Sequence, residues 1–227
     1  MRLLVFCLIV ACPVLCHAQE GRKVTCRFLC MDGTAPPPPL VNVSAKGAEI
    51  SCSVPANTFS AAIACYAKAD AISFLTASDL KPAAAAVIPA NVKAAILVFG
   101  PAPKPATGLP WQVSVIEDFA ADFPDGGALV ANLSSQGIRF VIDDNTVTLE
   151  AGKTHSCARP EKRDDFNMAA VVFQFQQNDS WQTVSENLLR FAPGMRYLIY
   201  AYQDPGSGHP RISTSQDFPP AKAPAAK

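Results

Sequence analysis

The chain of 227 residues contains two pairs of strand-like segments that match each other in the same order. NVKAAILVF (residues 91–99) is followed by WQVSVIEDF (111–119), and GMRYLIYAY (194–202) is followed by PRISTSQDF (210–218). The aligned residues agree in chemical class: Lys93 with Arg196, Ile96 with Ile199, Phe99 with Tyr202, and Asp118-Phe119 with Asp217-Phe218. Such internal similarity predicts a duplicated unit. We expect Lys93 and Arg196, and likewise Asp118 and Asp217, to occupy equivalent places in two superposable modules.

The similarity extends upstream, where residues 41–60 match residues 138–156. Each block reads as a strand, a polar turn, a second strand and then Ala-Asn or Ala-Gly. Lys46-Gly47 and Asp144-Asn145 suit the positive φ of a tight hairpin. Turns are also expected at Ala90-Asn91 and Pro193-Gly194, just before the most apolar strand of each block. We therefore predict two modules, at residues 21–124 and 125–218.

Strand patterns dominate both modules. Short β-branched or aromatic runs cover residues 24–30, 112–116, 138–143, 146–150, 169–175 and 196–202. Turn-forming residues separate them at the spacing typical of antiparallel sandwiches. Only residues 59–69, 78–86 and 184–189 could supply a helical turn or two, and none shows sustained helical periodicity. The expected fold is all-β, with two tandem antiparallel β-sandwich modules of immunoglobulin-like type that arise from internal duplication.

The N-terminus has the layout of a secretory signal peptide, which we place at residues 1–18. A single charge at Arg2 precedes an apolar run, and Cys16-His17-Ala18 forms a small-x-small cleavage site. Because Pro13 interrupts the run, a transmembrane anchor is the weaker interpretation. Lipid attachment at Cys12 is a further alternative. We expect a secreted, periplasmic or cell-envelope protein without a transmembrane segment in the mature chain.

The charge of the chain argues against nucleic acid as a partner. The full sequence has 19 basic and 19 acidic residues, and loss of Arg2 with the signal would leave 18 basic residues. No basic cluster stands out in the sequence. The tail, residues 219–227, is rich in proline and alanine and is expected to be disordered.

This pattern is similar to uncharacterised bacterial secreted proteins built from paired immunoglobulin-like sandwich modules. The features that carry the resemblance are the signal peptide, the hairpin block at residues 138–153, and the strand pair 195–202 and 211–217. These features are structural, and the cysteine and tryptophan spacing of true immunoglobulin domains is absent. The resemblance therefore implies an architecture only and carries over no catalytic residue.

Five cysteines follow the signal: Cys26, Cys30, Cys52, Cys65 and Cys157. An odd number leaves at least one thiol unpaired within the chain. Cys26 and Cys30 are four residues apart on one strand, about 13 Å, which is too far for a disulfide. If bonds form, Cys26 or Cys30 should pair with Cys52 or Cys65. The alternative is that these residues are buried apolar thiols.

No catalytic, cofactor-binding or metal-binding residue is predicted. His155 lies two residues from Cys157, but no third group completes a nucleophilic site. His209 is interpreted as an exposed loop residue. The acids at residues 143–145 and 164–165 could bind calcium, although a hairpin turn and a charged loop explain them more simply. No glycine-rich loop precedes a helix, so no phosphate site and no cofactor are expected.

Aromatic side chains are the remaining candidates for ligand contact: Trp181, Tyr197, Tyr200 and Tyr202. Tyr200 and Tyr202 should share one face of a strand, and Tyr197 the other. Exposed aromatics could stack on sugars or anchor a partner protein, whereas buried ones would complete the core.

We therefore expect a non-enzymatic structural or protein-binding module whose partner is an envelope or extracellular protein or glycan. The alternative is a carbohydrate-binding accessory protein, and a hydrolase is the third interpretation. A row of exposed aromatics would favour the second, and a pocket joining His155 to an acid would favour the third. Long uncovered edge strands would indicate β-augmentation with partner proteins.

Overall fold

The computed structural model describes residues 21–31, 33–102, 108–118, 123–204, 206, 208 and 210–218. The predicted signal peptide, the tail, Phe119 and His209 lie outside these residues. Strands and no helix form in the described part of the chain. Consistently, no helix there is long and apolar enough to cross a membrane.

The first half of the chain contains eight strands in two sheets. They are β1 (Arg22–Cys30), β2 (Leu40–Val43), β3 (Glu49–Cys52), β4 (Ile63–Ala67), β5 (Ala71–Thr76), β6 (Pro82–Val87), β7 (Ala94–Pro101) and β8 (Trp111–Glu117). One sheet has the order β4-β1-β7-β8 and the other the order β3-β2-β5-β6. Side chains from both sheets meet in one apolar core.

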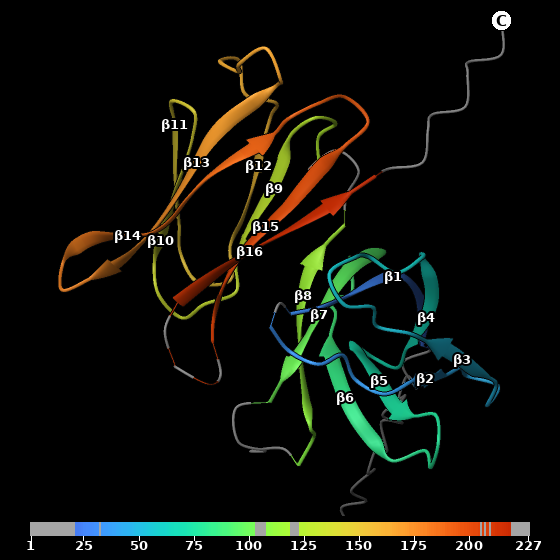
Figure 1. Cartoon of the computed structure of the whole chain (residues 1–227). Helices are drawn as coiled ribbons and strands as arrows, with labels where there is room; N and C mark the ends of the chain where they lie inside the picture. The colour runs from blue at the N-terminus through green and yellow to red at the C-terminus, as the bar shows by residue number, and fades with distance from the viewer. Residues whose placement is uncertain are drawn as a thin grey trace, which may run out of the picture.

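The second half contains the next eight strands, again in two sheets. They are β9 (Ala128–Asn132), β10 (Ile138–Ile142), β11 (Asn145–Leu149), β12 (Thr154–Cys157), β13 (Met168–Gln177), β14 (Ser180–Arg190), β15 (Arg196–Gln203) and β16 (Pro210–Asp217). The sheet orders are β12-β9-β15-β16 and β11-β10-β13-β14. Strand for strand, this is the order of the first half, and Figure 1 shows the halves as two lobes, blue to green and yellow-green to red.

Two of the four sheets are mixed, so the prediction of antiparallel sheets is confirmed in full only for the other two. β1 pairs with β7 in parallel, and β9 pairs with β15 in parallel, while the other pairings are antiparallel. In each half the first strand lies beside the seventh, which the chain reaches after passing through the other sheet. Parallel central strands are buried on both faces, and residues 95–100 and 197–202 are buried without interruption.

Alternation along the strands decides which side chains enter the core. Val24, Cys26, Phe28 and Cys30 of β1 point into the first core, as the sequence predicts. Leu29 lies on the opposite face, in a third apolar cluster.

The three segments considered for helical turns form strands instead. β4, β6 and β14 occupy them, so that prediction was wrong. In β6 the alanine-rich sequence favours a helix by propensity, yet Ala83, Ala84 and Ala86 are almost fully buried against the first core. Packing of small side chains between sheets outweighs the propensity, which is a weak preference.

The turns agree with the sequence pattern only in part. Ala90-Asn91 and Pro193-Gly194 are turns, as expected. Gly47 has a φ of 79°, but in the second hairpin the positive φ, 55°, is at Asp143. Since β11 already begins at Asn145, the expectation of positive φ at Asp144-Asn145 was wrong.

The structure places Ala94, one residue after Lys93, at the position equivalent to Arg196. Arg196 lies opposite Asp217, whereas the residue opposite Asp118 is Ala94, whose carbonyl accepts the backbone N–H of Asp118 at 3.0 Å. A slip of one residue exchanges the two faces of a strand. Accordingly, Ile96 lies in the cluster between the halves while Ile199 lies in the second core.

The two halves meet through an apolar cluster that we call the junction. It joins the outer faces of the sheets β4-β1-β7-β8 and β12-β9-β15-β16, and its buried members are Leu29, Met31, Ile96, Val98, Ile116, Phe123, Leu129, Ala131, Leu198, Tyr200 and Tyr202. In Figure 1, β7 and β8 lie next to β15 and β16 where the lobes touch.

A network of charged side chains lies beside the junction. Arg27 donates two hydrogen bonds to Asp118, at 2.7 and 3.0 Å, and one to Asp217 at 2.8 Å. Arg196 donates to the same oxygen of Asp217 at 2.8 Å. Burial opposes the charge of Arg27, but the two carboxylates outweigh it and raise its pKa. The guanidinium groups also lie over aromatic rings, Arg27 over Phe59 and Arg196 over Phe123.

Candidate functional site

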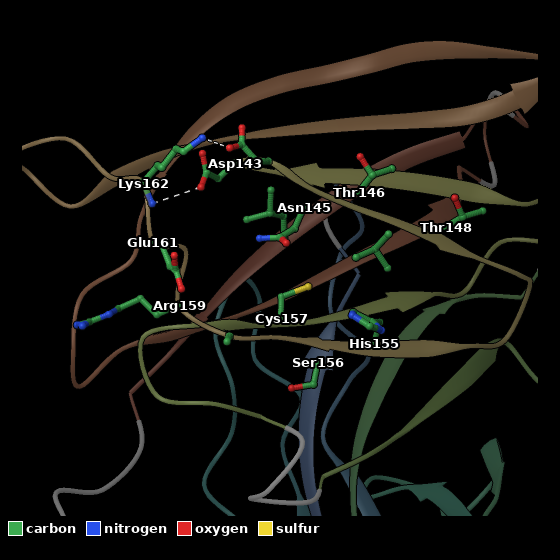
Figure 2. Close-up of a pocket in the computed structure, with 14 residues that line it drawn as sticks. Asp143, Asn145, Thr146, Thr148, His155, Ser156, Cys157, Arg159, Glu161 and Lys162 are labelled. Carbon is green, nitrogen blue, oxygen red and sulfur yellow. Dashed lines mark hydrogen bonds and ion pairs between the residues drawn. The ribbon is translucent and has the colours of Figure 1, made fainter.

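The second half has a cavity of about 770 Å³ between two edge strands. β11 ends one sheet and β12 ends the other, and both line the cavity together with Ala158, Arg159, Glu161 and Lys162. In Figure 2 the side chain of Asn145 on β11 points toward Cys157 of β12, whereas the side chains of Thr146 and Thr148 point away from β12. The lining is mixed in character and includes both carboxylates and cations.

The cavity contains the histidine and cysteine singled out in the sequence. His155 and Cys157 both line it, and in Figure 2 Cys157 points inward while Ser156 points away. No hydrogen bond or ion pair between described residues joins His155 to Cys157 or to an acid. The two side chains therefore share a wall of the cavity without a hydrogen bond between them.

Lys162 binds two of the acids that line the cavity. Lys162 forms an ion pair with Asp144 through its ammonium group, and its backbone N–H donates to Asp143 at 3.3 Å. Asp164 accepts the backbone N–H groups of Phe166 and Met168, which makes it a turn residue. Among the described residues, no group of three or more His, Cys, Asp or Glu side chains could hold a metal ion.

Cys157 should react slowly with iodoacetamide at neutral pH. Burial raises the pKa of its thiol to about 11, and only the thiolate is nucleophilic. Its alkylation rate should rise about tenfold per pH unit from about pH 7 to about pH 10, because the thiolate fraction does. Peptide mass spectrometry of quenched samples measures this rate. The urea-unfolded chain is the control, since its rate should level off near about pH 8.5; the same plateau in the folded protein would contradict the expectation.

The four candidate aromatics have different environments. Tyr200 and Tyr202 are buried in the junction, and Tyr197 lies in the second core, where its hydroxyl donates to the carbonyl of Arg190 at 3.1 Å. The face assignments made from the sequence are confirmed. Only Trp181 reaches the surface in part, with the guanidinium of Arg139 4.5 Å from its ring centroid. The structure therefore does not gather these four side chains into one exposed row.

The longest edge strand of the described sheets is β14, with 11 residues. It pairs with β13 on one side only and is largely exposed. Leu188 and Val184 are 64% and 40% exposed. The turn at its start has positive φ at both Asn178 and Asp179, which is the geometry of a tight hairpin. In Figure 1 the hairpin of β13 and β14 protrudes on the side away from the first half.

Sequence reasoning missed this edge for an identifiable reason. A bulge between Phe173 and Gln174 shifts the register, so Val184 has no partner of its own in β13. The extra residue breaks the apolar and polar alternation of SWQTVSENLLR, which made residues 184–189 resemble a helical turn. The long strand of β-branched and aromatic residues before it, paired through Asn178-Asp179, was the signal that could have predicted a hairpin.

No protein-family model matches the chain, and no curated protein matches it.

Proposed function

We propose that this is a secreted, non-enzymatic binding protein of the cell envelope or exterior that captures an extended segment of a partner protein along β14. Its two halves are immunoglobulin-like sandwich modules that arose by duplication. The common strand order of the halves supports the duplication. The exposed edge of β14 is the single observation that carries the binding proposal.

An unpaired strand edge presents backbone N–H and C=O groups that can pair with another strand. Natural edges are usually protected by short length, proline or lysine. Among the other edge strands, β3, β4, β11 and β12 have four or five residues, β8 has seven, and β6 and β16 each begin with a proline. By contrast, β14 has 11 residues and contains neither proline nor lysine. Its main-chain groups are therefore available for β-augmentation.

The exposed side chains beside this edge indicate the chemistry of the partner. Leu188 lies opposite Ala170 on the outer face of the sheet, and Leu189 turns inward to the second core. An added strand with aliphatic or β-branched residues on its outer face would cover Leu188. The partner segment is thus expected to be extended, free of proline and apolar on alternate residues.

Selection from a displayed library of random peptides tests the proposal. Peptides of this pattern should be enriched, and the double variant V184K/L188K should bind them at least about tenfold more weakly, because lysines block edge pairing. Both replaced side chains are already exposed, so circular dichroism and thermal unfolding should stay unchanged. V87K is the matched control, since Val87 is 72% exposed on the short edge strand β6. Enrichment that is equal on both variants, or no enrichment, would refute the role of β14.

A further inference from the structure

Three buried thiols lie together in the first core. Cys26 of β1 and Cys65 of β4 belong to one sheet, and Cys52 of β3 belongs to the other. Their exposed fractions are 0%, 0% and 1%. The thiol of Cys65 interacts with the thiols of both Cys26 and Cys52. The contact between Cys52 and Cys65 crosses from one sheet to the other, next to the edge strands β3 and β4.

We infer that Cys52 and Cys65 form a disulfide that joins the two sheets of the first half, and that Cys26 remains a thiol. All five cysteines among the described residues are free thiols in the structure. The register of β1 and β4 disfavours a bond between Cys26 and Cys65, and the thiol with which Cys52 interacts is that of Cys65.

The register disfavours a bond between Cys26 and Cys65. Val24 lies opposite Cys65, and Cys26 lies opposite Ile63. Cys26 and Cys65 are therefore diagonal neighbours, which are separated by about 7 to 8 Å in antiparallel sheets. Disulfides span about 5.5 to 6 Å between Cα atoms and require closer Cβ atoms than such diagonals provide. Cys52, which approaches from the opposite sheet, is free of this constraint.

The second half has no comparable pair of thiols, and there the equivalent edges flank an open cavity. β11 and β12 take the places of β3 and β4 in the strand order. Cys157 is the one described cysteine of that half, and it lines the cavity of about 770 Å³. The inferred bond would thus close one sandwich covalently at the edge where the other is open.

The oxidation balances with a disulfide as co-reactant. Each of the two thiols loses one proton and one electron as the Sγ–Sγ bond forms. A disulfide of the glutathione class accepts the two electrons and two protons, and its own S–S bond breaks to give two thiols. Contact with Cys26 and burial help to raise the pKa of Cys65 to about 12. Because the thiolate is the attacking species, the bond should form faster during refolding than in the folded chain.

The test is refolding of the reduced protein from urea with oxidised glutathione, followed by alkylation in denaturant and peptide mass spectrometry. Cys52 and Cys65 should be linked to each other, while Cys26, Cys30 and Cys157 should be alkylated. The oxidised protein should unfold about 10 °C above the reduced one, since the bond closes a short loop. This difference should vanish in C52A and C65A and persist in C26A and C157A.

Comparing oxidised with reduced samples of each variant separates loss of the bond from loss of the side chain. A bond from Cys26 to either partner would overturn the inference. So would alkylation of all five cysteines after oxidative refolding.

Discussion

Replacing Asp217 with alanine is expected to lower the free energy of unfolding by about 3 kcal/mol. Its carboxylate is 8% exposed and accepts hydrogen bonds from Arg27 of the first half and Arg196 of the second. Arg27 keeps Asp118 as a partner in the variant, but among the described residues Arg196 keeps only the carbonyl of Phe123 at 3.1 Å and the ring beneath it. A buried guanidinium without a carboxylate is costly, whereas an exposed one is solvated by water.

Urea unfolding monitored by circular dichroism measures this effect. Arg211→Ala is the control, because Arg211 is 58% exposed in its pair with Asp204 and exposed pairs contribute little. D217N should fall between wild type and D217A, since the amide oxygen still accepts a hydrogen bond but carries no charge. If D217A unfolds at the same urea concentration as R211A, the network does not hold the halves together.

The junction has a consequence for the proposed function. Residues from both halves form its apolar cluster, and Arg27 spans the halves at its margin. The apolar cluster and the ion pair set the direction in which the β13–β14 hairpin points relative to the first half. In the proposed function, the first half would be the base from which the second presents its long edge strand.

The sequence predicts the strands well because alternation is a local property. The faces of β1 and β15 follow directly from period-two patterning, and so does the division of Tyr197 from Tyr200. Self-similarity predicted the common strand order of the halves, because matched strands in matched order tend to pair alike.

Properties that depend on distant strands were not predictable in this way. The parallel pairing of β1 with β7 joins residues far apart in the sequence, and no local pattern encodes it. From the alternation of β1, Arg27 would be expected to face solvent. In the structure it binds the carboxylates of Asp118, which follows β8, and Asp217, which ends β16. The sequence alignment of the two halves was also wrong by one residue at β7. Apolar residues line both faces of β7, so the sequence does not show which face points into the core.

Phe74→Ala should lower the free energy of unfolding by about 4 kcal/mol. Phe74, on β5, is fully buried and contacts two aromatic rings of the facing sheet. Its ring centroid lies 5.9 Å from that of Phe28 and 5.4 Å from that of Phe99, both in edge-to-face geometry. The variant loses both contacts and leaves a cavity at the centre of the first core, which the surrounding strands can fill only in part.

Phe166→Ala removes the same side chain from a site that is 74% exposed, so it should leave the stability unchanged within measurement error. Calorimetry of both variants distinguishes two forms of cooperativity. If the junction couples the halves, F74A should shift one common transition to lower temperature. A split into two transitions, with the second at the wild-type temperature, would mean that the second half folds without support from the first. Equal melting of F74A and F166A would instead contradict the central position of Phe74 in the core.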